Sequence, residues 1–244
     1  MKFTSAALTA LLAGATSAAA DSSTNLVVNG SFETNTVKAG TWTTIKATDV
    51  EGWEPLTPGA SFEFWGRGFG GITPPQGNNI VEIDVHNSKT GTDGLYQVLS
   101  TTKNQEYEVS FSIRARRNDI KSASEAVIVE WNGVETSETG YYASAVGEWE
   151  RVKIIVVGTG SDKLLFRETA TTQYNDSLGP LLDDVVVTEY SPKPSDACGK
   201  DNMIINCSFE DTKVQKNTYK FFPAGQVLGW KSLNGEPLEL WGTL

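Results

Sequence analysis

Apolar and polar residues alternate along most of this 244-residue chain, and a period of two is typical of a β-strand with one buried face. The clearest example runs from Tyr107 to Arg116, where apolar residues occupy every odd position and Glu, Ser and Arg occupy the even ones. The segment from Val81 to His86 alternates in the same way. Similar patterns predict further strands at 95–99, 126–131, 149–157, 163–167 and 181–189.

Clusters of turn-forming residues separate these segments. They include Pro58-Gly59, Asn132-Gly133 and the Gly-containing runs at 74–77 and 91–94. No amphipathic helical pattern follows the first 20 residues. Many short strands with Gly-rich turns over roughly 165 residues predict an all-β fold, a two-sheet sandwich of the jelly-roll type.

The chain also contains an internal repeat. Residues 25–33, Asn-Leu-Val-Val-Asn-Gly-Ser-Phe-Glu, return at 202–210 as Asn-Met-Ile-Ile-Asn-Cys-Ser-Phe-Glu. About 45 residues of a β-type module cannot enclose a core of their own. We therefore expect one complete domain and the start of a second copy, in a chain that is part of a longer protein. Two later matches recur at nearly the same spacing, Gly52-Trp53 as Gly229-Trp230 and Trp65-Gly66 as Trp241-Gly242.

The ends and the linker define the predicted organisation. Residues 1–20 have the features of a secretory signal peptide, with Lys2, an apolar stretch and Ala18-Ala19-Ala20 before Asp21. This apolar stretch is shorter than the roughly 20 residues of a membrane helix. Two prolines within residues 191–195 favour an extended linker. We expect a secreted, extracellular protein with a jelly roll at 21–190, a linker at 191–200 and the second copy at 201–244.

The acidic balance narrows the range of partners. The chain has 30 acidic and 20 basic side chains, a formal net charge of −10. Nucleic-acid phosphates need a basic surface and anionic membranes attract basic segments, so neither is an expected partner. Ordinary solubility through like-charge repulsion also accounts for the acidity.

Cysteine, histidine and sequon positions add three expectations. Cys198 and Cys207 lie around the start of the second copy, and they either form a disulfide with each other or pair with other thiols of a longer chain. The single histidine argues against a zinc site of the Cys/His type. Asn175, in an Asn-Asp-Ser sequon within a turn-like segment, is the predicted glycosylation site. Asn29, in the repeated motif, is expected to brace the following turn instead.

The order of motifs resembles that of galactose-binding-like jelly-roll domains. The resemblance spans about residues 25–190 and restarts at 202, although the second copy has Cys207 where the motif has Gly. Such domains occur in carbohydrate-binding modules and in tandem-domain plant cell-wall proteins of a domain-of-unknown-function family. The resemblance implies extracellular binding of sugars, often with a structural calcium ion. The motifs that carry it are 25–33, which resembles the opening strand of these domains, Val81-Glu82-Ile83-Asp84, Gln97 in Leu-Tyr-Gln-Val-Leu, 110–116, Trp131-Asn132-Gly133 and Gly179-Pro180-Leu181-Leu182-Asp183-Asp184-Val185.

Asp183 and Asp184 are candidates for a metal site. Adjacent strand positions face opposite sides, so one of the two aspartates should be buried and should need a partner. A calcium ion held by carboxylates and carbonyls would provide one. The resemblance implies Glu33 and Asp184 as ligands, with Asp183 as the second choice. The alternative partners are backbone N–H groups or basic side chains.

Polar and aromatic side chains are the candidates for ligand binding. Sugar hydroxyls take directional hydrogen bonds, and sugar C–H faces pack on aromatic rings. The polar rows read equally as a solvated outer face with weak salt bridges. Trp53, which recurs in the second copy, is expected in the core or at its rim. The predicted ligand-binding residues are Glu82, Asp84, His86, Gln97, Arg114 and Arg116 from the polar rows, and Trp65, Tyr141 and Tyr142 from turn-rich segments.

Catalysis finds little support. A Ser–His–Asp arrangement would depend on His86 alone, and no Gly-x-Ser-x-Gly motif accompanies it. The Gly-rich run at 66–71 lacks the Gly-Lys-Ser/Thr ending of a phosphate loop. We therefore expect a non-catalytic module that binds a cell-wall or extracellular polysaccharide. The alternatives are a structural or protein-interaction module of the matrix or wall, and an accessory region of a larger carbohydrate-active enzyme.

Overall fold

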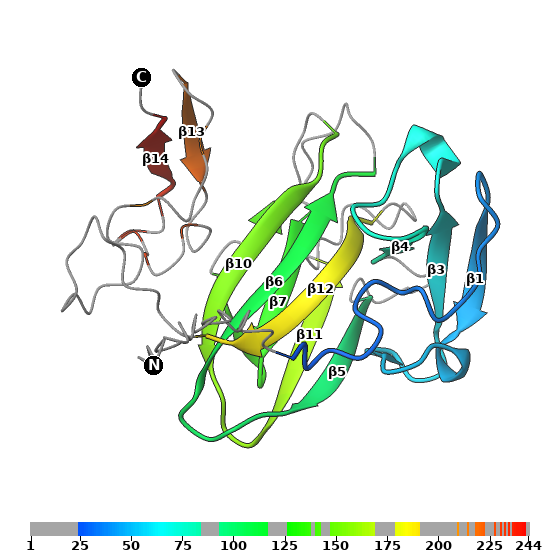
Figure 1. Ribbon diagram of the computed structural model, residues 1–244, viewed down its shortest axis with the longest axis horizontal. Coiled ribbons are helices and arrows are strands. Elements are labelled where there is room, and N and C mark those ends of the chain that lie inside the picture. The colour runs from blue at the N-terminus through cyan, green and yellow to red at the C-terminus, as the bar shows by residue number, and fades with distance from the viewer. Residues whose placement is uncertain are drawn as a thin grey trace, which may run out of the picture.

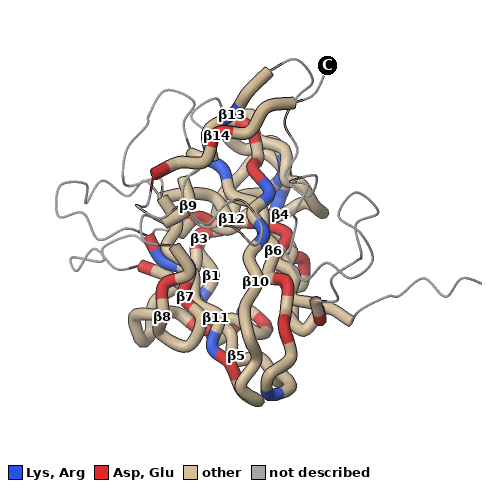
Figure 2. Tube along the Cα trace, turned by 90° about the vertical axis from the view of Figure 1, so that its left-hand side faces the viewer, with Lys and Arg blue, Asp and Glu red and all other residues tan. Residues whose placement is uncertain are grey.

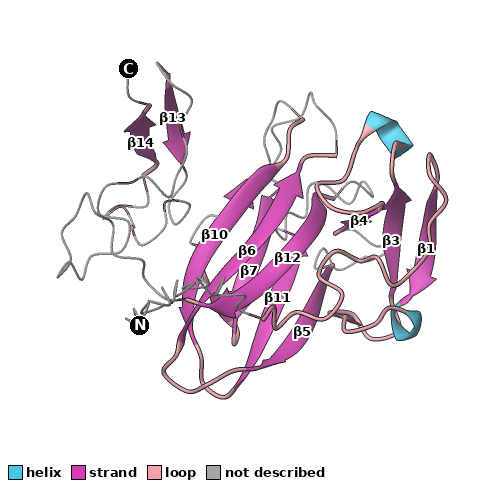
Figure 3. Ribbon diagram, in the orientation of Figure 1, coloured by secondary structure: helices cyan, strands magenta, loops and turns pink. Residues whose placement is uncertain are grey.

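The described residues form two facing β-sheets (Figures 1 and 3). The computed structural model describes residues 24–83, 93–116, 126–137, 140–142, 147–168, 179–190, 209, 214, 218–222, 227, 230, 232, 234 and 236–242. Sheet A contains, in spatial order, β1 (Trp42–Lys46), β3 (Ser61–Gly66), β4 (Asn79–Glu82), β12 (Leu181–Glu189), β6 (Glu106–Arg114) and β10 (Glu150–Val157). Sheet B contains β2 (Glu54–Pro55), β5 (Gly94–Ser100), β11 (Ser161–Glu168), β7 (Ala126–Trp131) and β8 (Val134–Glu135), with β9 (Tyr141–Tyr142) also paired to β7.

The predicted all-β two-sheet sandwich is confirmed. The chain changes sheet at most connections between β4 and β12, as expected for a jelly roll. The only helical elements among the described residues are two 3-10 turns, η1 (Ala47–Asp49) and η2 (Phe69–Gly71). In the described part of the chain, no helix has the length and apolarity needed to span a membrane. A separate two-stranded hairpin, β13 (Tyr219–Phe222) with β14 (Leu238–Trp241), lies in the C-terminal region.

All seven predicted strands are present, with ends shifted by a few residues. The prediction missed β1 and β3 at the edge of sheet A. In β3 the sequence Ser-Phe-Glu-Phe-Trp-Gly does alternate, with Phe62 and Phe64 in the core and Glu63 and Trp65 on the opposite face. Because Trp65 is as apolar as the two phenylalanines, the alternation does not stand out in the sequence.

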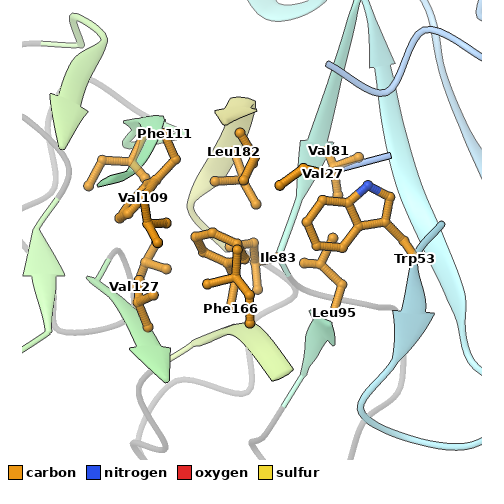
Figure 4. Close-up of a cluster of buried hydrophobic side chains, with 14 of the residues drawn as sticks. Val27, Trp53, Val81, Ile83, Leu95, Val109, Phe111, Val127, Phe166 and Leu182 are labelled. Carbon is orange, nitrogen blue, oxygen red and sulfur yellow. The ribbon is translucent and has the colours of Figure 1, made fainter. Parts of the chain in front are cut away.

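An unbroken chain of aromatic contacts crosses the core between the sheets. Phe32 packs on Trp53 with ring centroids 5.4 Å apart, and Phe166 packs on Phe111 at 5.0 Å. Trp53 joins the two pairs by contacting Phe166 at 6.2 Å. Phe64 extends the chain at one end and Tyr141 at the other. Trp53 is 2% exposed, which confirms its expected core position, and aliphatic side chains such as Val109, Leu95 and Leu182 surround the rings (Figure 4).

The 25–33 motif does not form a strand, contrary to the expectation from resemblance. Its backbone makes two hydrogen bonds with β12, from Leu26 N–H to Val187 O (2.8 Å) and from Val185 N–H to Gly30 O (2.9 Å). Asn29 and Phe32 then adopt positive φ angles of 52° and 61°, which turn the chain. Asn29 braces this turn as predicted, because its Oδ1 accepts from Thr34 N–H at 3.2 Å.

A buried aspartate stabilises the end of the sandwich at which β5, β7 and β10 finish. Asp162 at the start of β11 is fully buried. It accepts hydrogen bonds from Thr159 N–H (2.8 Å), Thr159 Oγ1 (2.7 Å), Thr101 Oγ1 and Asn132 Nδ2. Burial acts to raise the pKa of Asp162, but these bonds outweigh it and hold the pKa below its ordinary value. One carboxylate therefore ties together the connections that leave β5, β7 and β10.

We expect Asp162→Asn to lower the free energy of unfolding by about 2–4 kcal/mol, because an amide cannot accept all four bonds. Urea denaturation at neutral pH would measure the loss. The control is Asp49→Asn, an exposed carboxylate in a 3-10 turn, which should change stability by less than about 0.5 kcal/mol. Equal stability of the wild type and Asp162→Asn would contradict the anchoring role.

Candidate functional site

Strand ends from both sheets converge at one end of the sandwich, which we call the loop end. In sheet A, Leu181 at the start of β12 pairs with Glu82 at the end of β4 and with Arg114 at the end of β6. In sheet B, Ala126 at the start of β7 pairs with Tyr142. The described strand ends on either side of 84–92, 117–125, 143–146 and 169–178 all lie at this end. Asp84, His86 and Asn175 belong to them and lie outside the described residues, as do Cys198 and Cys207.

Two glutamates face each other near the loop end, on the outer side of sheet A. Glu63 on β3 is the direct cross-strand partner of Glu82 on β4, and the two residues are 4% and 1% exposed. Trp65 lies two residues further along β3, on the same face as Glu63 and opposite Ile80. Its indole N–H donates to Glu63 Oε1 at 2.8 Å and to Glu82 Oε2 at 3.1 Å.

Arg116 completes this cluster. Its guanidinium lies over the Trp65 ring, 5.1 Å from the centroid, and its Nη1 contacts Glu82 Oε1 at 2.7 Å. Gly179 N–H donates to the same oxygen at 3.0 Å. The Arg116 side chain keeps 24% of its surface exposed, whereas the Glu82 side chain keeps 1%. The sequence analysis selected Trp65, Glu82 and Arg116 as ligand-binding residues, and the structure places these three in contact. It did not select Glu63.

The two glutamates hold a proton between them. Burial raises the pKa of Glu82 to about 9, and a hydrogen bond with Glu63 and the Glu63 charge add to the rise. The Arg116 charge and the Gly179 N–H oppose this rise only in part. Like charges directly opposite on a sheet repel, so sharing a proton relieves the pair. At neutral pH the Glu82 carboxyl group therefore keeps its proton.

The connection between β3 and β4 covers this cluster. Phe69 packs edge-on against Trp65 at 4.8 Å, and Ile72 is buried with Trp65, Ile80 and Leu181. Trp149, before β10, packs against this group and donates its indole N–H to Thr73 O at 2.8 Å. Trp65 is 3% exposed as a result. The expectation of an exposed Trp65 in a turn is therefore wrong, because β3 and its connection enclose the ring.

Two other predicted ligand residues, Gln97 and Tyr141, have positions that differ from the prediction. Gln97 lies in sheet B and is 5% exposed; it accepts from Val28 N–H (2.7 Å) and donates to Val28 O (3.0 Å). Its side chain thus holds the 25–33 segment and does not join the face of sheet A. Tyr141 is fully buried and packs on Phe111, because β9 turns it into the core. Arg114 is half-buried on β6, and this burial lowers its pKa while the charge of Glu148 opposes the change.

Tyr142 is an exposed aromatic residue at the loop end, at 40% exposure. It neighbours buried Tyr141 on β9, so the alternation of the strand turns its ring to the outside. Trp131 on β7 is buried, at 8% exposure.

Glu33 and Asp183 form a second cluster of acidic side chains, which we call the Glu33–Asp183 cluster. Its Oε1 accepts from Asn78 N–H (2.8 Å) and Asn79 N–H (2.7 Å). Asp183, fully buried on β12, accepts from the adjacent Gln76 N–H at 3.2 Å. Burial raises the pKa of Asp183 to about 8, and the nearby charges of Asp184 and Glu33 add to the rise. The structure thus places Asp183 beside Glu33.

Asp184 lies apart from this cluster, contrary to its predicted role. Its carboxylate forms an ion pair with Arg151 at 2.6 Å. Asp184 has a positive φ of 54° at an irregularity in the β12–β6 pairing, and this turns its side chain toward β10. The same Arg151 donates to Ser110 Oγ at 2.8 Å. Asp184 is therefore engaged with a basic partner, which was the alternative expectation.

Asn35 and Asn79 supply two further oxygens that sequence analysis missed. The Nδ2 of Asn79 donates to Phe32 O (2.8 Å) and Asn35 O (2.6 Å), and the Nδ2 of Asn35 donates to Asp49 O (2.9 Å). The Oδ1 atoms of both asparagines are buried without a hydrogen-bond partner. Buried amide oxygens without partners are rare in proteins and call for an explanation such as a bound ion or water.

We expect the stability of the protein to fall as pH rises, and Glu82→Gln to remove part of that fall. The folded state holds the Glu82 proton up to about pH 9, whereas the unfolded carboxyl releases it near its ordinary pKa of 4.5. The stabilisation is thus complete at low pH and is lost as pH rises through 9. Between pH 4.5 and about 9, the unfolding free energy of the wild type should therefore fall relative to that of Glu82→Gln. The fall should be up to about 1.4 kcal/mol per pH unit.

Denaturant titrations at several pH values would measure this difference. Glu108→Gln is the matched control, since Glu108 pairs with Lys153 in a more exposed position at 3.0 Å. Its pH dependence should follow that of the wild type. Parallel curves for wild type and Glu82→Gln would show that Glu82 carries no proton in the folded state.

Comparisons with known proteins give remote matches. No protein-family model matches the chain. Two curated proteins named multifunctional-autoprocessing repeats-in-toxin, from Vibrio vulnificus and Vibrio cholerae, are each 28% identical to it over 175 residues. The matched region is 71% of this chain but 3% of each toxin.

Similar solved structures include several carbohydrate-binding modules. The CBM35 of Paenibacillus barcinonensis is 15% identical, and the match covers 62% of this chain and all of that chain, with a TM-score of 0.36. A CBM4 module is 14% identical, with 67% and 99% covered and a TM-score of 0.36. TmCBM61, in complex with β-1,4-galactotriose, is 16% identical, with 69% and 100% covered and a TM-score of 0.34. These values do not place the chain in any one family.

Proposed function

We propose that the protein is a secreted, non-catalytic module that binds a cell-wall or extracellular polysaccharide at the loop end of its sandwich. The observation that carries the proposal is the position of Arg116. Its guanidinium is fixed between the Trp65 ring and the Glu82 carboxyl group, yet part of its surface stays exposed. A donor held in one orientation can bind hydroxyl groups with little loss of side-chain entropy.

Tyr142 supplies the second component that sugar recognition requires. Its exposed ring lies at the same end of the sandwich as Arg116 and offers an apolar face for stacking. Basic and acidic residues are interspersed over the described strands (Figure 2). Together with the net charge of −10, this distribution favours an uncharged ligand over a polyanion. The motif order that resembles galactose-binding-like domains supports the same ligand class.

We expect the full chain to be retained on at least one uncharged polysaccharide from a panel of cellulose, β-mannan and β-galactan. Tyr142→Ser should weaken that binding about tenfold, because the stacking contact is lost. Val157→Ser is the matched control: Val157 is also exposed, at 51%, but it ends β10 at the opposite end of the sandwich. Affinity electrophoresis or calorimetry would measure the change.

Two outcomes would contradict the proposal. Equal loss of binding in Tyr142→Ser and Val157→Ser would show that the glycan does not bind specifically at the loop end. A folded wild type that binds no glycan would favour the protein-interaction function, which a pull-down from extracellular extract would then test.

We propose further that calcium binds at the Glu33–Asp183 cluster and stabilises it. The donor set consists of oxygens only, which suits a hard cation: two carboxylates and the Oδ1 atoms of Asn35 and Asn79. No three His, Cys, Asp or Glu residues form a metal-binding group in the described part of the chain. Amide and backbone oxygens would therefore have to complete the site. A bound cation would relieve the burial of the Asp183 charge and partner the two amide oxygens.

We expect calcium to raise the Tm of the full chain, by the equivalent of about 2.7 kcal/mol at a concentration of 100 times Kd. Asp183→Asn should abolish this rise, whereas Asp184→Asn should keep it. The two variants each replace one carboxyl group by an amide at neighbouring positions, so their difference isolates the site. Thermal unfolding with calcium and with a chelator would measure it. A calcium response that is lost in Asp184→Asn and kept in Asp183→Asn would overturn the assignment to Asp183.

A further inference from the structure

Three aromatic rings are exposed together on the β13–β14 hairpin. Tyr219, Phe221 and Trp241 are 54%, 55% and 71% exposed. We call these three residues the aromatic strip. Scattered apolar residues are normal on a protein surface, but grouped ones often mark a binding site. Among the described residues, the other exposed aromatic side chains, Trp42 and Tyr142, stand on separate strands.

Strand pairing places the strip on one face of the hairpin. Tyr219 pairs directly with Trp241, and Phe221 lies two residues along on the same face, opposite Glu239. The Tyr219 and Trp241 rings are 5.2 Å apart and inclined by 31°. Phe221 meets Tyr219 edge-on at 5.7 Å. The rings thus form one continuous surface with a carboxylate at its margin.

The other face of the hairpin attaches it to the sandwich. Lys220 Nζ forms an ion pair with Glu150 Oε1, 2.8 Å away, at the start of β10. The same ammonium lies 5.1 Å from the Phe222 ring centroid, and Phe222 is 7% exposed. Since Glu150 pairs with Ile113 near the end of β6, this attachment lies at the loop end (Figure 1). The aromatic strip therefore projects outward close to the end proposed to bind glycan.

The internal repeat shows which face of the hairpin this is. Tyr219 and Trp241 pair as Trp42 and Trp65 do in the first copy. The flanking bonds also correspond, from Gly66 N–H to Thr41 O (2.8 Å) and from Gly242 N–H to Thr218 O (2.9 Å).

In the first copy the counterpart face is the outer face of sheet A. There Trp42 is 44% exposed and Thr44, the counterpart of Phe221, is exposed as well, while the core side carries Phe62 and Phe64. The exposure of Tyr219 and Phe221 therefore follows from the face they occupy. Trp65 differs, because Phe69 and Arg116 cover it.

We propose that the aromatic strip is a second glycan-binding site, which stacks on the apolar faces of pyranose rings in an uncharged polysaccharide. The ligand class rests on the function proposed above. Rigid rings with polar tips, here the Tyr219 hydroxyl and the Trp241 N–H, suit a partner that is apolar on its faces and polar at its edges. Two sites on one chain raise the apparent affinity for a repeating polymer without new contacts.

The test compares the full chain with the triple variant Tyr219→Ala/Phe221→Ala/Trp241→Ala on insoluble cellulose, β-mannan and β-galactan. We expect retention of the triple variant to fall at least tenfold on the polymer that retains the wild type. The control triple, Val98→Ala/Val134→Ala/Val157→Ala, removes equally exposed apolar groups from the sandwich and should bind as the wild type does. The double variant Tyr219→Phe/Trp241→Phe keeps the rings and should keep most of the retention. This distinguishes loss of stacking from loss of the hairpin.

Other results would overturn the proposal. If the triple variant binds as the wild type while Tyr142→Ser binds weakly, the strip is no glycan site and the proposed function stands. If the wild type binds none of the polymers, both proposals fail. If sedimentation shows that the wild type self-associates and the triple variant is monomeric with unchanged glycan retention, the strip is a contact between copies of this chain.

Discussion

The chain of aromatic rings across the core is the interaction on which the rest of the structure depends. Phe32, Trp53, Phe166 and Phe111 connect an N-terminal turn, the segment before β2, and one strand from each sheet. Aromatic side chains bury the largest apolar areas of any residue type, so these few contacts contribute a large part of the packing energy. Trp53 also donates its indole N–H to Asn29 O at 3.0 Å. Packing in the core thereby fixes the turn that positions Glu33.

The outer face of sheet A follows from the same alternation that builds this core. Once Phe62 and Phe64 point inward, Glu63 and Trp65 must point outward, and pairing with β4 sets Glu63 opposite Glu82. Such a pair of acids is unfavourable unless it is protonated or partnered, and here it is both. The cost of burying it is offset by holding Arg116 in one orientation. Departures from local folding rules, such as this buried pair of acids, are expected at functional sites.

The two copies of the repeat share local geometry as well as sequence. The Phe32–Trp53 rings are 5.4 Å apart at 32°, and the Phe209–Trp230 rings are 5.0 Å apart at 32°. Phe32 and Phe209 both have a φ of 61°. The same residues thus produce the same turn and ring contact twice. The outer faces of the two hairpins differ, since one carries Trp42 and Thr44 and the other carries Tyr219 and Phe221. On the same outer faces, Glu63 and Trp65 recur as Glu239 and Trp241.

The sequence by itself determined seven of the strands, the sandwich and the core position of Trp53, because a two-residue period and turn residues are local properties. It also selected Glu82 and Arg116 as ligand-binding candidates from their alternating rows. Only the tertiary structure decided which side chains meet across strands far apart in the chain. Cross-strand register joins Glu63 to Glu82, and the irregularity in β12 directs Asp183 toward Glu33 and Asp184 toward Arg151. Burial of Trp65, Tyr141 and Gln97 likewise depends on segments that pack over them, so a pattern within one strand could not reveal it.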